Sequence, residues 1–421
     1  MQHLPKLRLV AAATVLFAAH AGGAAAAPSI AAVQGPIQHG AIVSIQGSGF
    51  GQKATAAPTV WDDASGSDPN QKWDQLLPNS NDPAFRMAYR SPSEITKAAN
   101  SGPAPQPPHK HDSRYLAGAH YNSTSTDADS GWNVGLTKYG IQSSPYTYFS
   151  FYYRADPDWY AASGSDDNHK MYSYAAGNGM YPSNNYWYFN PEPNVFGSSS
   201  SWSIGANYQT GSPKFFDSCT DIRAVDGSVV DWYSTKPGGN GTYYPPCNAF
   251  PKVSVTSPKA AWVKIELILK HADSTNGVHI IRQDNQRIWY VELNDDVNPR
   301  TTNIRSESIG GYSRDAGSTD AYRNNWRYFS DVYYDKSWAR VIFANAQQYQ
   351  NASIVEPQIP QSWNSSGISI KVNLGRLDPS TPIYAFVFDS SGQRNAAGFP
   401  VTASAGGAAP SPPTNVRATP Q

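Results

Sequence analysis

Charged residues are scarce in this 421-residue chain, and long apolar runs are nearly absent. Asp, Glu, Lys and Arg make up 15% of the residues, and their charges cancel to a formal net charge of +0. Nucleic-acid binders usually carry a basic face, so this balance argues against a nucleic-acid partner. No segment after the N-terminus is apolar over the length that a membrane-spanning helix needs, and we therefore expect no membrane insertion.

The N-terminus contains the one marked apolar run, at 9–19, with Lys6 and Arg8 before it and small residues after it. A short basic region, a short apolar region and small residues are typical of a secretory signal peptide. The sequence therefore predicts a signal peptide over residues 1–27, cleaved near Ala21 or Ala26. We expect a secreted protein, extracellular or periplasmic.

Cysteine is nearly absent, with only Cys219 and Cys247 present. Two isolated cysteines lack the spacing of a metal knuckle, which argues against a metal-binding or nucleophilic role. In an exported chain the expectation is one disulfide between them. Such a crosslink reduces the chain entropy of the unfolded state, which would stabilise the folded protein by roughly 3.6 kcal/mol at most.

Aromatic residues and turn formers are abundant, with 26 Tyr, 12 Trp, 33 Gly and 33 Pro. Between residues 328 and 401, aromatic and β-branched residues alternate with polar ones, and turn residues interrupt the runs. This pattern is typical of short antiparallel strands. Because most of the mature chain has the same pattern, the sequence predicts an all-β protein with almost no helix.

Individual strands are predicted near 114–121, 146–154, 262–270, 278–282 and 287–292. The strand at 146–154 carries aromatics on both faces, so we expect it to be central and covered twice. Asp284 and Asn285 lie between the last two strands as a hairpin turn signal. Residues 97–113 are rich in proline and are expected to form an exposed loop.

The N-terminal mature segment has a pattern of its own. Gly40, the alternating run 42–45 and the glycine-rich run 47–51 resemble an IPT/TIG immunoglobulin-like domain, and the glycines suit a tight turn with positive φ. We expect a partial Ig-like segment over 28–58, a main domain over 59–402 and a disordered Pro/Ala/Gly-rich tail over 403–421. The alternative is that the strands of 28–58 belong to the main sandwich.

A wider resemblance runs through the main domain. It is carried by VWDD, RYLAGAHY, YFSFYYR, WVKIELILK, YFSDVYYD, SWARV and IPQSW. These segments resemble a group of secreted bacterial concanavalin A-like jelly-roll proteins, with a sandwich similar to that of polysaccharide lyases. The resemblance implies a concanavalin A-like jelly roll and export, and it transfers no catalytic residue, because fold alone does not give function.

A concave sheet of this kind commonly binds an extended sugar chain. A lyase needs a cation to neutralise the uronate, a base and an acid. The five candidates for this work are Lys264, Glu266, His279, Arg282 and Tyr290. The favoured alternative puts Lys264, Glu266 and Lys270 on a solvated outer face. The compact Arg-x-Glu-x-Arg motif of alginate lyases is absent.

A second candidate surface is aromatic and rich in amides. Rigid rings beside adaptable amides suit a polar ligand. The residues are Asn184, Asn185, Tyr186, Trp187 and Tyr188. The alternative is that these rings cover the edge of the core under a long loop.

Metal-binding patterns are weak. His109 and His111, two apart on the proline-rich loop, could bind a metal with His120, but we expect the first two to be exposed and without a role. Acidic pairs such as Asp62–Asp63, Asp127–Asp129, Asp166–Asp167 and Asp295–Asp296 could hold a structural calcium, and a solvated turn is the expected state of each. We therefore expect no metal site and no cofactor.

Three functions follow from these observations. The first is a secreted, noncatalytic protein that interacts with an extracellular polysaccharide. The second is a polysaccharide lyase acting by β-elimination on a uronate polymer. The third is a structural or adhesive surface protein that makes only protein contacts.

Overall fold

The fold consists of antiparallel strands and short 3₁₀ turns. The computed structural model describes residues 26–77, 82–97, 103–120, 133–139, 144–155, 168–175, 185–190, 203–208, 261–270, 278–292, 306–314 and 325–401. Within these ranges there is no α-helix, and the 3₁₀ turns are η1 (Pro69–Gln71), η2 (Pro92–Glu94) and η6 (Tyr349–Asn351). The same ranges contain no helix that could span a membrane. The predicted all-β fold class is confirmed.

The larger body contains an eight-stranded antiparallel sheet in the order β14-β13-β12-β8-β16-β6-β5, with β3 paired to part of β16. Its strands are β3 (Val60–Asp62), β5 (Ala88–Arg90), β6 (Tyr115–His120), β8 (Tyr146–Ala155), β12 (Val263–Lys270), β13 (Val278–Gln283), β14 (Gln286–Glu292) and β16 (Asn325–Asp335).

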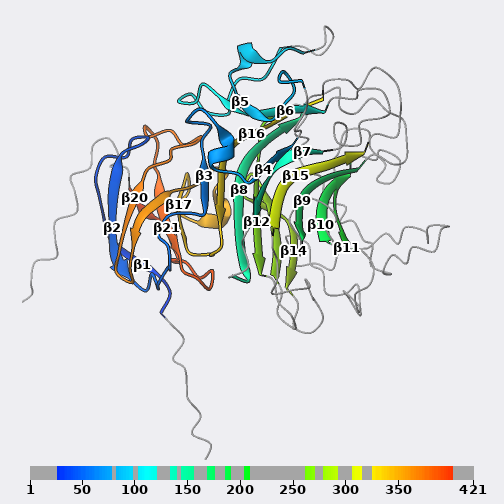
Figure 1. The fold of residues 1–421 in the computed structure, drawn as a ribbon. Helices are drawn as coiled ribbons and strands as arrows, with labels where there is room; N and C mark the ends of the chain where they lie inside the picture. Colours follow the sequence, from blue (N-terminus) through cyan, green and yellow to red (C-terminus); the bar gives the residue numbers. More distant parts are fainter. Residues whose placement is uncertain are drawn as a thin grey trace, which may run out of the picture.

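A six-stranded sheet in the order β11-β10-β9-β15-β7-β4 lies against it (Figure 1). Its strands are β4 (Gln75–Leu77), β7 (Asn133–Tyr139), β9 (Asn168–Ala175), β10 (Asn185–Asn190), β11 (Ser203–Tyr208) and β15 (Ser306–Arg314). The chain crosses repeatedly between the two sheets: β6, β8 and β16 belong to the larger one, and β7, β9 and β15 to the smaller. This double-sheet antiparallel arrangement is the expected concanavalin A-like jelly roll.

Strand β8 is central, as predicted, because it pairs with β12 on one side and β16 on the other. On one face, the Thr147 hydroxyl donates to Glu307 of β15. On the other face, the Tyr152 hydroxyl donates to Glu356 at 2.5 Å. The aromatic side chains of β8 are therefore buried on both faces of the strand. Burial of each ring stabilises the folded state by on the order of 2–3 kcal/mol.

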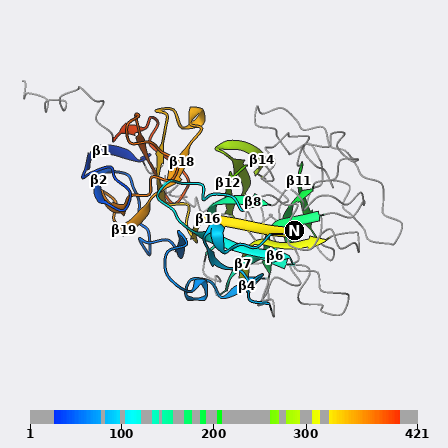
Figure 2. The ribbon, with the colours of Figure 1, turned by 90° about the horizontal axis from the view of Figure 1, so that it is seen from above.

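A smaller sandwich stands beside the jelly roll (Figures 1 and 2). One of its sheets has the order β1-β2-β20-β19 and the other β18-β17-β21-β22. Its strands are β1 (Ser29–Gln34), β2 (Ile42–Ser48), β17 (Arg340–Ala344), β18 (Val355–Pro357), β19 (Ile359–Trp363), β20 (Gly367–Lys371), β21 (Tyr384–Phe388) and β22 (Phe399–Pro400).

The N-terminal segment is completed by C-terminal strands. Val43, Ile45 and Phe50 share one buried core with Phe343 and Ile370, and β2 pairs with β20 through most of its length. Thus 28–58 does not close on itself: it supplies two strands to a sandwich whose other strands come from 340–400. Pairing over such sequence distances cannot be read from local patterns.

The tip of the β13–β14 hairpin of the jelly roll contacts the smaller sandwich. Asp284 and Asn285 take φ values of 48° and 63° at its tip, which is the left-handed geometry that Asp and Asn tolerate best and that a two-residue turn requires. The Asn285 side chain donates to the carbonyls of Tyr349, at 2.9 Å, and Ala352, at 2.7 Å. The predicted turn is confirmed, and its tip lies against η6 of the smaller sandwich.

Candidate functional site

Two of the five predicted lyase residues lie between the bodies. Lys264 and Glu266 of β12 are 4% and 1% exposed, so the expectation of a solvated outer face was wrong. The Lys264 ammonium donates to the Val355 carbonyl at 2.5 Å and pairs with Glu356, and Glu266 accepts from Tyr148 at 2.6 Å. Strand β18 of the smaller sandwich covers this face of β12.

Glu356 is the centre of this buried polar contact. Besides Lys264, it accepts from the Tyr152 hydroxyl and from the backbone amide of Arg376 at 3.0 Å. Burial, and then the adjacent Glu356 carboxylate, raise the pKa of Tyr152 well above its ordinary value. The Tyr152 hydroxyl therefore keeps its proton and donates a hydrogen bond, so it does not serve as a base. These groups satisfy one another inside the protein and present no acid or base to a polymer.

Arg282 is also held by internal contacts. Its guanidinium lies 5.3 Å from the centre of the Tyr349 ring and donates to Asn285 at 3.1 Å. His279 and Tyr290 occupy β13 and β14 opposite Leu269 and Ile280 in the backbone register, and their side chains lie outside the described residues. Their role as an acid and base pair stays a prediction.

The aromatic candidates lie on β10, the second strand from the edge of the six-stranded sheet. Backbone pairing places Trp187 between Tyr172 of β9 and Ala206 of β11. Asn185 lies between Tyr174 and Tyr208 in the next row. The side chains of Tyr186 and Tyr188 on the same strand, like that of Trp187, lie outside the described residues, as does the whole of Asn184. The register thus adds aromatic positions on β9 and β11 that sequence proximity did not indicate.

His109 is fully buried, and the prediction that it is exposed was wrong. Its Nε2 lies 3.0 Å from Asp331 and 3.9 Å from Asp112, and its ring stands edge-on to Tyr152, with the ring centres 4.6 Å apart. Pro105 of the same loop is also buried, and its carbonyl accepts from the Tyr115 hydroxyl at 3.0 Å. The proline-rich loop is thus partly interior.

The pKa values in this cluster depend on burial and on the neighbouring charges. Burial opposes protonation of His109, but Asp331 and its neighbours outweigh it and raise the His109 pKa. Burial, and then the charge of Asp331, raise the pKa of Asp112 to about 7. His111 stacks on His109 with ring centres 5.3 Å apart. The sequence analysis missed both aspartates, although an acidic residue inside the aromatic run YFSDVYY was a usable signal.

Asp62 differs from the solvated turn that was expected, because its side chain is completely buried. It accepts from Trp73 at 2.7 Å, from Tyr89 at 2.9 Å and from Lys72 at 3.1 Å. These protein donors occupy both carboxylate oxygens and leave little room for a calcium ion. The acidic residues at 127–129, 166–167 and 295–296 lie outside the described residues.

The predicted Cys219–Cys247 disulfide, the signal peptide and the C-terminal tail lie outside the described residues too, and they stay predictions. Free-thiol titration of the denatured, unreduced protein tests the disulfide. Two reactive thiols per chain would contradict it.

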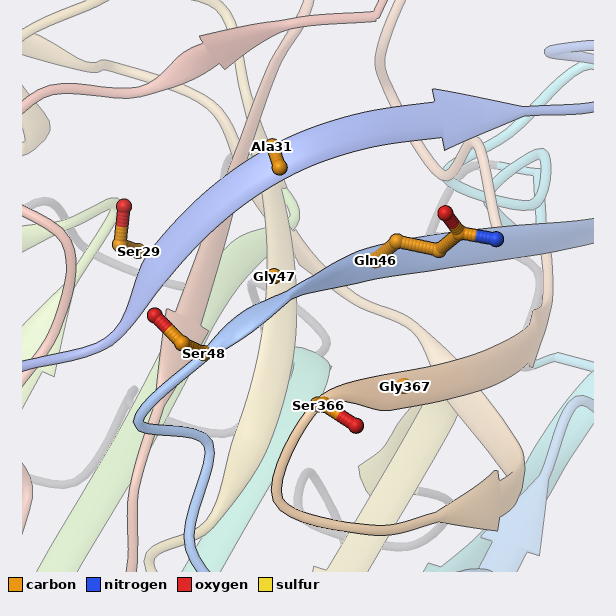
Figure 3. A pocket seen from close by; sticks show the side chains of 7 residues that line it. All are labelled: Ser29, Ala31, Gln46, Gly47, Ser48, Ser366 and Gly367. Carbon is orange, nitrogen blue, oxygen red and sulfur yellow. The ribbon is translucent and has the colours of Figure 1, made fainter.

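A shallow hollow lies on the smaller sandwich, between β1, β2 and the turn before β20 (Figure 3). Its lining consists of Ser29, Ala31, Gln46, Gly47, Ser48, Ser366 and Gly367. No ionisable side chain lines it. The hollow therefore offers hydrogen bonds but no acid, base or cation.

No sequence family matches the chain, and no curated protein is similar to it in sequence. Solved structures with a related arrangement include the PL-14 alginate lyase from Aplysia kurodai, at 13% identity and a TM-score of 0.34, covering 53% of this chain and 84% of that one. The endo-β-1,4-glucuronan lyase from Trichoderma reesei is 10% identical with a TM-score of 0.35, covering 63% and 92%. The cellulose-induced protein Cip1 is 14% identical with a TM-score of 0.33, covering 66% and 97%. Likeness at this level assigns no residue and no activity to the chain.

Proposed function

We propose that this is a secreted, noncatalytic protein that binds an extracellular polysaccharide on the β9–β10–β11 end of its six-stranded sheet. The observation that carries the proposal is the register of these three strands. It brings aromatic positions from three separate sequence segments into two adjacent rows, with one amide residue, Asn185, among them.

The geometry of the rows suits a sugar chain. Neighbouring strands lie about 4.8 Å apart, so positions two strands apart are separated by about 10 Å. Tyr174 and Tyr208 are two strands apart, with Asn185 between them. Ring faces stack on the apolar faces of sugars, and an amide between them donates to and accepts from hydroxyls.

The described part of the other candidate set supports binding without cleavage. Lys264 is buried and pairs with Glu356, Glu266 is buried and accepts from Tyr148, and Arg282 packs on Tyr349. A cation that neutralises a uronate must reach the polymer, and the two cations of this set, Lys264 and Arg282, make their contacts within the protein. The neutral total charge also favours recognition by stacking and hydrogen bonds over capture of a polyanion.

The test measures binding and cleavage on the same samples. Affinity electrophoresis against alginate, glucuronan, pectate and neutral glucans should show retardation in at least one gel, and Trp187→Ala should weaken it by about 1 kcal/mol or more. Trp61→Ala, on the eight-stranded sheet, is the matched control and should bind as the wild type does. Because few ion pairs are involved, added salt should matter little.

Two outcomes would replace the proposal. Release of unsaturated uronates that is lost in His279→Ala and Tyr290→Phe would establish the lyase function instead. No retardation by any of the glycans would favour a structural or adhesive surface protein.

A further inference from the structure

We propose that His109, Asp112 and Asp331 form a binding site for a divalent transition-metal ion, with Zn²⁺ as the probe, where the proline-rich loop meets strand β16. The site is independent of the polysaccharide function proposed above. Among the described residues this is the one group of three or more His, Cys, Asp or Glu side chains placed to share a metal ion.

The spacing of the three side chains fits one ion. One ligand atom from each residue lies within 4.8 Å of the others. His109 Nε2 and Asp331 Oδ2 lie 3.0 Å apart. Ligand atoms bound at about 2.0–2.2 Å around a tetrahedral or octahedral centre are themselves about 3 Å apart. Small rotations of the Asp112 carboxylate, now 3.9 Å from His109, would complete the set.

Buried polar atoms in the cluster lack partners. The His109 side chain is 0% exposed. Within the described part of the structure, neither its Nδ1 nor the Asp112 Oδ2 has a hydrogen-bond partner. A buried polar group without a partner is costly, and most such groups in native proteins are satisfied by protein, water or an ion. A bound cation would satisfy the free carboxylate oxygen.

The backbone of β16 is distorted where it presents the third ligand. The pairing of β16 with β8 shifts between Ser330 and Tyr333, and Asp331 inside this bulge has φ of +48°. Bulges re-aim side chains, and a non-glycine residue at positive φ is retained where the surroundings require it. Asn373 contacts the Asp331 carboxylate at 3.4 Å and helps to orient it.

The donor set selects the class of ion. One imidazole and two carboxylates suit borderline ions such as Zn²⁺, whereas Ca²⁺ and Mg²⁺ prefer oxygen ligands throughout. Two carboxylates also balance the charge of a divalent ion in a buried position. Bound metal would fasten the loop before β6 to the bulge of β16.

The experiment measures metal content in the full chain. Protein stripped with EDTA is dialysed against ZnCl₂ at neutral pH and then against metal-free buffer. The number of zinc ions bound per chain is measured by inductively coupled plasma mass spectrometry. Wild type should retain one zinc more per chain than Asp331→Asn, in which asparagine keeps the shape and tolerates the same φ. His109→Gln should lose the same zinc. Lys110→Gln, an exposed change in the same loop, should bind as the wild type does.

A second measurement avoids dependence on variants that fold poorly. Zinc at a hundredfold excess over its Kd should raise the unfolding temperature of the stripped wild type by about 3 °C. Equal zinc content in wild type and Asp331→Asn, or no thermal shift in the wild type, would overturn the proposal and leave a His–Asp ion pair. Retention of Ca²⁺ but not Zn²⁺ would overturn the assigned class of ion.

Discussion

The buried pair of Lys264 and Glu356 allows a quantitative test of how the two sandwiches are joined. Lys264 lies on β12 of the jelly roll and Glu356 on β18 of the smaller sandwich, and both are nearly inaccessible to solvent. Removing one member of a buried ion pair typically costs 3–5 kcal/mol, because the other charge is left uncompensated. The size of the loss depends on the remaining partners of that charge.

After Lys264→Met, Glu356 keeps two donors, the Tyr152 hydroxyl and the Arg376 amide. We therefore expect a loss near the lower end, about 3 kcal/mol. After Glu356→Gln, the Lys264 ammonium keeps the Val355 carbonyl, and we expect a loss of about 4 kcal/mol. In the double variant neither charge is left alone, so the losses should not add, and the coupling energy should be about 2–3 kcal/mol.

Urea unfolding followed by tryptophan fluorescence measures these free energies, since the chain has 12 Trp. Lys371→Met, at an exposed position of β20, is the control and should change the free energy by no more than about 0.5 kcal/mol. The reasoning fails if Lys264→Met is as mild as this control, or if the two losses add in the double variant.

Three further changes test other parts of the structure. Burial raises the pKa of Asp335, so the folded state holds this proton more tightly and the residue's stabilising contribution falls as the pH rises above about 4. The unfolding free energy of wild type minus that of Asp335→Asn should fall toward neutral pH in urea titrations, and a rising difference would contradict this. Gly375→Ala should lower the unfolding temperature sharply, because φ is +48° and a Cβ would collide with the Glu356 carboxylate; an unchanged temperature would show that the turn can move. Trp73→Phe removes the indole donor from Asp62 and should cost about 1–3 kcal/mol in urea unfolding, whereas a neutral result would mean that another donor replaces it.

The fold class and many of the strands could be predicted from the sequence alone. Alternating polar and apolar residues follow from the two-residue repeat of a strand, and the Asp284–Asn285 turn follows from the positive φ that a tight hairpin needs. The double burial of β8 was also readable, because the aromatics of 146–154 occupy both faces. These features depend on residues close together in the chain.

Where the polar residues of these strands lie depends on long-range packing, which no local pattern encodes. The alternation in β12 puts Lys264 and Glu266 on one face, but only the packing of β18 makes that face interior rather than solvated. His109 is likewise buried in the folded chain, where it contacts Asp331 of β16, 222 positions further along the sequence. The N-terminal strands found their partners among residues 359–371. A local pattern fixes which side of a strand a residue occupies, whereas long-range packing fixes what covers that side.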